Sequence, residues 1–158
     1  MNWQELCERP DLHNLPFKIE LDEKGRIIMS PVRVYHSAYQ AEISYLLRSL
    51  AKEGKALAEC AIKTRLGTKV TDVAWASAER FVLVKEEVEC SIAPEVCVEV
   101  LSASNTGDEI NIKKELYFEN GAKEVWVCYQ TGCVTFYNRS GEIDKSEIFP
   151  AFPKKIEM

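Results

Sequence analysis

The stretch from Pro94 to Tyr117, PEVCVEVLSASNTGDEINIKKELY, decides the fold. An almost unbroken apolar run over residues 95–101 predicts a strand that is buried on both faces. Cap and turn residues over 102–107 predict a sharp end to that strand. A helix is expected next, from about Asp108 to Asn120, and Gly121 is well suited to end it.

Two charged side chains interrupt the apolar pattern of this unit. Glu99 lies inside the strand, where a carboxylate is costly unless a cation, a hydrogen-bond donor or a metal pairs with it. Lys113 falls inside the apolar arc of the helix at about 100° per residue. That arc consists of Ile110, Ile112, Leu116 and Tyr117. Lys113 can therefore approach Glu99, form a buried salt bridge, or extend past its neighbours to water.

The patterns on either side predict one domain over residues 1–158, in which 1–16 form an N-terminal extension. A strand, a helix and a second strand over 95–129 predict a parallel pair, and hairpins make the rest of the sheet antiparallel. The expected class is α/β or α+β, with a mixed central β-sheet flanked by helices and an N-terminal β-hairpin. The other predicted elements are the hairpin strands 17–21 and 26–30, the helix 36–53, and the strands 56–66, 70–75, 134–137 and 143–148.

Composition limits the class of protein. The chain has 158 residues, of which 46% are hydrophobic and 28% charged, as in an ordinary globular domain. A net charge of −5 without a polybasic tail does not favour a non-specific nucleic-acid binder. The sequence has no membrane-spanning apolar stretch and no signal-peptide pattern, so we expect a cytoplasmic protein. The six cysteines form no CxxC pair, which disfavours a zinc or redox centre.

A third polar residue joins the two already described. Asp72 lies inside the apolar strand 70–75. Carboxylates on neighbouring strands, such as Asp72 and Glu99, can bind a hard divalent cation through oxygen. A nearby lysine such as Lys113 can orient water and stabilise negative charge, and the three residue types suit phosphodiester hydrolysis. Glu42 and His36 on the helix 36–53 are accessory candidates, although spacing alone favours solvent exposure for both.

The order of several motifs resembles the Uma family of predicted restriction endonucleases, within the PD-(D/E)xK nuclease superfamily. The similarity covers roughly residues 17–139. The matching residues are Asp72, Glu99-Val100-Leu101-Ser102, Lys113 four residues before Tyr117, Gly121 and Glu124-Val125-Trp126, with Met29-Ser30-Pro31 and His36 upstream. The resemblance implies a restriction-endonuclease-like fold with Asp72, Glu99 and Lys113 as catalytic residues. It also implies that Asp72 and Glu99 bind Mg²⁺ or Mn²⁺ and that the substrate is nucleic acid, with DNA expected.

Three positions depart from the family pattern. Thr71 stands where a proline usually precedes the strand aspartate. Leu101 occupies the lysine position of the superfamily motif, so the lysine role falls to Lys113, a relocation typical of the family. The strand that often ends in aspartate ends here in Cys128-Tyr129. The three core positions are all retained, so the resemblance still implies an active site.

Catalytic activity and oligomeric state are the two remaining points. The acidic net charge favours a non-catalytic binding or interaction module that keeps the fold and a structural ion network, whereas the intact set of two acids and a lysine favours an enzyme. Cutting both strands of a duplex commonly needs two active sites, so we expect a homodimer. The strands 134–137 and 143–148 are candidate sheet edges for that contact.

Overall fold

The structure is a computed structural model that describes residues 1–103 and 105–158. Ser104, which belongs to the predicted turn, lies outside the described residues. The elements in chain order are α1 (Trp3–Cys7), the 3-10 helix η1 (Pro10–Leu12), β1 (Phe17–Leu21), β2 (Ile27–Pro31), α2 (Val34–Leu50), β3 (Lys55–Thr64), β4 (Gly67–Ala76), α3 (Ala78–Val84), β5 (Val96–Val100), α4 (Gly107–Glu119), β6 (Glu124–Cys128), β7 (Val134–Asn138) and β8 (Gly141–Ile143).

Six strands form the central sheet, in the order β3-β4-β5-β6-β7-β8. The pair β5–β6 is parallel, and the chain passes between its two strands through α4. All other neighbouring pairs of this sheet are antiparallel. Val98 lies opposite Val73 of β4 on one side and Trp126 of β6 on the other. The predicted mixed sheet with a parallel unit at its centre is therefore confirmed.

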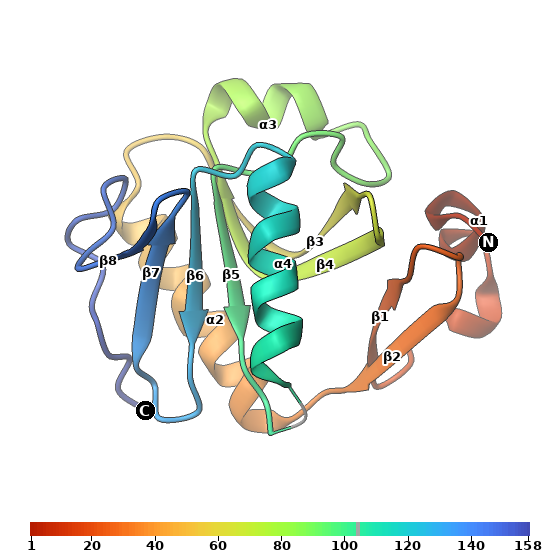
Figure 1. Ribbon diagram of the computed structural model, residues 1–158, viewed down its shortest axis with the longest axis horizontal. Helices are drawn as coiled ribbons and strands as arrows, with labels where there is room; N and C mark the ends of the chain where they lie inside the picture. The colour runs from red at the N-terminus through yellow and green to blue at the C-terminus, as the bar shows by residue number, and fades with distance from the viewer. Residues whose placement is uncertain (104) are drawn as a thin grey trace.

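Helices cover both faces of this sheet, with α4 in front of β5 and β6 and α2 behind them (Figure 1). On the α2 side, Ile43 and Leu47 pack in a buried apolar cluster with Val98. On the α4 side, Tyr117 packs in a second cluster with Cys97. Successive residues of β5 thus enter different cores, which is why this strand is apolar almost throughout.

The helix α4 begins and ends within one residue of the predicted bounds. The Thr106 hydroxyl accepts the N–H of Glu109 at 3.2 Å and caps the N-terminus. Gly121 has a φ of 105° just after the helix. The predicted apolar arc is partly wrong, because Ile112 is 45% exposed and lines a surface cleft. The arc residues that are buried are Ile110, Leu116 and Tyr117.

The hairpin β1–β2 is a separate two-stranded sheet, drawn at the right of Figure 1 beside α1. Its β1 strand turns polar residues toward the rest of the protein, so that Glu20 is buried whereas Phe17 is exposed. The Glu20 carboxylate accepts the N–H of Val70 in β4 at 2.7 Å. Gly67 has a φ of +88°, and a Cβ there would lie 2.3 Å from the Leu21 carbonyl oxygen. This close approach requires glycine and fixes the hairpin against β4.

The C-terminal part differs from the prediction. The expected strand 143–148 is wrong beyond Ile143, because β8 ends there. The Glu124 carboxylate instead accepts the Ser146 hydroxyl at 2.6 Å and the backbone N–H groups of the next two residues. Those donors are thereby satisfied without a strand partner. The expected edge at 134–137 is also wrong, since β7 pairs with both β6 and β8.

Within residues 1–103 and 105–158, no helix has the length and apolar character needed to cross a bilayer.

Candidate active site

A cleft of about 470 Å³ lies where the hairpin, the central sheet and both long helices meet. Its polar lining includes Lys18 and Glu20 of β1, His36 of α2, Asp72 of β4, Glu99 of β5 and Lys113 of α4. Residues far apart in sequence thus face one space.

The backbone of Asp72 lies at an interruption of the β3–β4 ladder. The pairing passes from Ala58–Val73 to Cys60–Thr71 and omits Glu59 and Asp72 between them. Glu59 has a φ of 52°, a left-handed conformation that is costly for a residue other than glycine. The Asp72 carbonyl accepts the Gln40 side-chain amide of α2 at 2.9 Å instead. Side chains of α2 thus contact Asp72 twice, Gln40 at its carbonyl and His36 at its carboxylate.

The Asp72 carboxylate is buried and has three partners. Its Oδ1 atom lies 3.1 Å from Lys18 Nζ and 3.3 Å from His36 Nε2. Its Oδ2 atom accepts the backbone N–H of Val100 at 2.8 Å. Burial alone would raise the pKa of Asp72, but Lys18 and His36 hold that pKa well below its ordinary value. Asp72 is therefore ionised, and its hydrogen bond raises the pKa of His36.

Glu99 lies on the neighbouring strand with a different balance of forces. Its Oε1 atom accepts the Tyr117 hydroxyl at 2.5 Å and lies 3.7 Å from Lys113 Nζ. Its Oε2 atom lies 3.6 Å from Lys18 Nζ. Complete burial raises the pKa of Glu99 to about 7, against the opposing effect of the two lysines. This carboxyl group therefore exchanges its proton near neutral pH.

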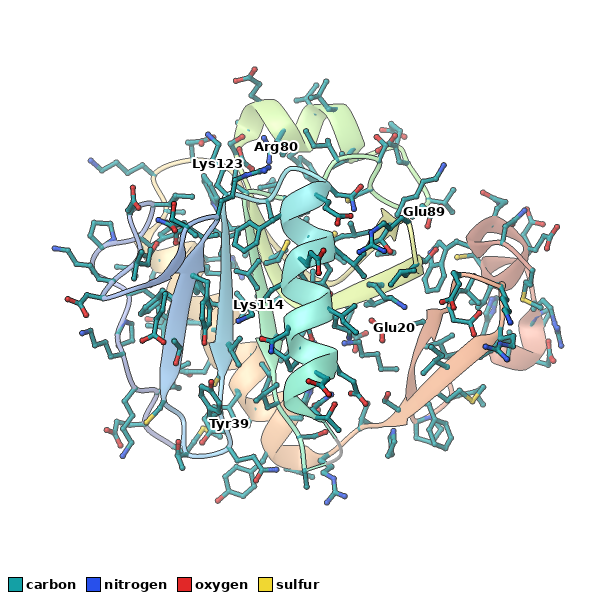
Figure 2. The ribbon with its side chains drawn as sticks, viewed as in Figure 1. Glu20, Tyr39, Arg80, Glu89, Lys114 and Lys123 are labelled. Carbon is teal, nitrogen blue, oxygen red and sulfur yellow. The ribbon has the colours of Figure 1, made fainter. Side chains whose placement is uncertain are left out.

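Lys113 points into the cleft, as the helical pattern predicts, but its closest partner is a residue of the hairpin. Its Nζ atom donates to Glu20 Oε2 at 2.9 Å, a shorter contact than that with Glu99. Glu20 lies between the hairpin and α4 (Figure 2). Burial opposes ionisation of Glu20, but Lys113 and Lys18 lower its pKa, so this carboxylate is charged.

Lys18 lies among three carboxylates. Its Nζ atom is 3.1 Å from Asp72, 3.6 Å from Glu99 and 4.0 Å from Glu20. Burial would lower the pKa of Lys18, but these carboxylates raise it well above its ordinary value. Lys18 is therefore a permanent cation at the centre of the cleft.

The structure brings together most of the residues singled out by sequence. Asp72, Glu99, Lys113 and His36 all line the cleft. Glu42 lies half-buried on α2 and is not among the lining residues. Sequence reasoning missed Lys18 and Glu20. The available signal was their i, i+2 spacing, which places both side chains on one face of β1, but such a polar face ordinarily faces water.

Comparisons with known proteins agree with this architecture. The sequence profile of the Uma2 family, described as "Putative restriction endonuclease", matches residues 3–155. A crystal structure of a "putative nuclease belonging to DUF820" from Anabaena variabilis ATCC 29413 is similar, with a TM-score of 0.72 and 18% sequence identity. The similarity covers 98% of this chain and 94% of that one, and it confirms the predicted nuclease-type fold. No curated protein matches the sequence. Because the family profile spans nearly the whole sequence, the chain belongs to the Uma2 family.

Proposed function

We propose that this protein is an endonuclease that hydrolyses phosphodiester bonds in DNA with the help of Mg²⁺ or Mn²⁺. Asp72, Glu99 and Lys113 form its catalytic centre. One observation carries the proposal: two buried carboxylates on the adjacent strands β4 and β5 both contact the same ammonium group, Lys18 Nζ, at 3.1 and 3.6 Å. That arrangement lies in an open cleft of about 470 Å³, as a substrate site requires.

The residues present fit a divalent cation. Carboxylate oxygens are the ligands that Mg²⁺ prefers, and this ion keeps several waters and commonly uses only one or two carboxylates. Asp72 and Glu99 would supply that pair, and the ammonium group of Lys18 already marks a position that favours positive charge. Among the described residues, no group of three or more Asp, Glu, His or Cys side chains is arranged to hold a metal. When bound, the ion supplies a Lewis acid and a more acidic water.

The protein's own groups prepare the remaining chemistry. Lys113 can donate to a phosphoryl oxygen or to an attacking water, and the Glu20 carboxylate at 2.9 Å orients its ammonium group. Tyr117 donates to Glu99 and fixes the orientation of that carboxyl group on β5. His36 adds a second donor at Oδ1 of Asp72, the oxygen that Lys18 also contacts. These contacts orient the three catalytic side chains, which all belong to helices or strands. A reacting phosphodiester must be positioned by groups with such a fixed geometry.

The charge of the cleft supports a requirement for cations. Seven Asp or Glu side chains but only four Lys or Arg side chains line the cleft, so acidic groups outnumber basic ones. A phosphodiester is itself anionic, so the cleft repels it unless cations bind there. We therefore expect no cleavage in the presence of a chelator.

Cleavage assays test the proposal directly. A panel of DNA and RNA substrates is incubated with the protein and Mg²⁺ or Mn²⁺, alongside Asp72→Asn, Lys113→Ala and the surface control Glu119→Gln. We expect DNA cleavage by the parent and the control, and a loss of at least about 100-fold in both site variants with the fold retained. If both variants cut as well as the parent, the assignment is wrong.

A non-catalytic binding module is the second candidate. It is favoured by the pairing in the cleft, where each of Glu20, Asp72 and Glu99 lies within 4.0 Å of a lysine. A structural ion network would be paired in the same way. In that case the parent protein cuts nothing with either ion, and Asp72→Asn only lowers stability.

We also propose that the active form is a homodimer, because cutting both strands of DNA commonly needs two active sites. The strands at the sheet edges are β3 and β8. Light scattering at micromolar concentration should report twice the monomer mass of 18.0 kDa. A clean monomer would remove this part of the proposal.

A further inference from the structure

Lys18 occupies the place where the proposed function requires a cation. Its side chain is only 12% exposed, and its ammonium group bridges the two proposed ligands, Asp72 and Glu99. We propose that Lys18 is an internal counter-ion of the cation site, which a divalent ion must displace before it binds. This inference rests on the proposed function for the identity of the site, and it adds a residue that sets the affinity of that site.

The ammonium group and a divalent ion exclude each other. Lys18 Nζ now contacts Oδ1 of Asp72 and Oε2 of Glu99, and a divalent ion held by these two carboxylates would compete with it for them. A doubly charged ion held by those oxygens would lie within a few ångströms of Lys18 Nζ, and their repulsion is strong in a buried site. A monovalent ion offers no more charge than the lysine already supplies, so Lys18 also favours divalent over monovalent cations.

The hairpin does not depend on Lys18 for its position. Glu20 Oε2 accepts the N–H of Val70 at 2.7 Å and the ammonium group of Lys113 at 2.9 Å. Lys69 Nζ donates to the Leu21 carbonyl at 3.2 Å. These contacts remain when the Lys18 side chain rotates away on its flexible four-carbon stem. The displacement therefore needs a side-chain movement into the open cleft and no movement of β1.

Lys113 has a different role, although it lies in the same cleft. Its shortest contact is with Glu20, and its distance from Glu99 is 3.7 Å. Among the described residues its ion pairs are with these two carboxylates, so it does not bridge Asp72 and Glu99. We therefore expect Lys113 to stay in place when a cation binds.

Calorimetric titration with Mn²⁺ tests this role. Lys18→Met keeps the apolar stem and removes the competing charge, so we expect its dissociation constant for Mn²⁺ to be at least about tenfold lower than that of the parent. Lys24→Met, in the exposed turn of the same hairpin, is the matched control and should bind as the parent does. Asp72→Asn added to Lys18→Met should abolish the gain. Equal or weaker binding by Lys18→Met would overturn the inference.

A second measurement needs no variant. Acetylation of lysines in the parent protein, read by mass spectrometry, should leave Lys18 protected without a divalent ion. Saturating Mn²⁺ should increase its labelling several-fold while that of Lys113 stays low. Unchanged or reduced labelling of Lys18 would contradict the displacement, even if Lys18→Met failed to fold.

These results separate the inference from the proposed function. Neither measurement uses a nucleic acid. Tighter Mn²⁺ binding by Lys18→Met in a protein that cuts no substrate would leave the inference intact and remove the nuclease. Cleavage by the parent without a gain in affinity in Lys18→Met would do the opposite.

Discussion

Replacing Lys113 by methionine tests the ion network that organises the cleft. The Lys113 and Glu20 side chains are 14% and 9% exposed and lie 2.9 Å apart. Removing one partner of a buried pair typically costs about 3–5 kcal/mol, because a charge is left buried without compensation. Glu20 keeps the Val70 N–H at 2.7 Å and Lys18 at 4.0 Å, so the loss is partly compensated. We therefore expect Lys113→Met to lower the free energy of unfolding by about 3 kcal/mol.

Urea unfolding without divalent ions measures this loss, provided that the slope of the transition stays constant. The pair Arg65–Glu119 supplies the control, because its contact is also short, at 3.0 Å, but its side chains are 53% and 40% exposed. Arg65→Met should cost no more than about 1 kcal/mol. Adding Glu20→Gln to Lys113→Met should recover part of the loss, since the unpaired charge is removed. If Lys113→Met costs no more than Arg65→Met, the pair is solvated and the reasoning is refuted.

Three other predictions use stability as the readout. Glu124→Ala leaves the Trp126 indole N–H and the buried Ser146 hydroxyl without their acceptor, so thermal unfolding should show a loss of at least about 2 kcal/mol; an unchanged Tm would contradict it. Gly67→Ala forces a Cβ into the Leu21 carbonyl at a φ of +88° and should cost about 1–3 kcal/mol and expose the hairpin to proteases, whereas undiminished protease resistance would argue against the tight docking. Burial raises the pKa of Glu99 from 4.5 to about 7, so the folded state binds more protons than the unfolded state between these values. The parent should therefore lose stability relative to Glu99→Gln as pH rises through that window, by up to about 3 kcal/mol at 1.4 kcal/mol per pKa unit, and a constant difference between pH 5 and 8 would refute the shift.

The centre of the fold could be predicted because its signals are local. The apolar run of β5 indicates burial on both faces, and the helix that follows has a cap, an apolar arc and a terminating glycine within a few residues. The proximity of Asp72 and Glu99 could also be predicted from sequence, because it follows once the strands β4 and β5 are neighbours. The inward direction of Lys113 follows from the helical period.

The rest of the site depends on contacts that no local pattern encodes. Lys18 and Glu20 face protein rather than water because of how the hairpin docks. That docking depends on Gly67, the first residue of β4. The partner of Lys113 was accordingly expected on the strand rather than on the hairpin. Similarly, the segment after Ile143 is not the predicted strand, because the buried carboxylate of Glu124 accepts backbone N–H groups of that segment.

A crystal structure with Mn²⁺ and a short DNA duplex tests the central claim most directly, because the anomalous signal of the metal locates it without ambiguity. We predict one peak at bonding distance from the Asp72 and Glu99 carboxylates, with Lys18 turned away and a phosphodiester group next to Lys113. DNA bound elsewhere on the surface, or an Mn²⁺-free cleft in which Lys18 still bridges Asp72 and Glu99, would contradict the account.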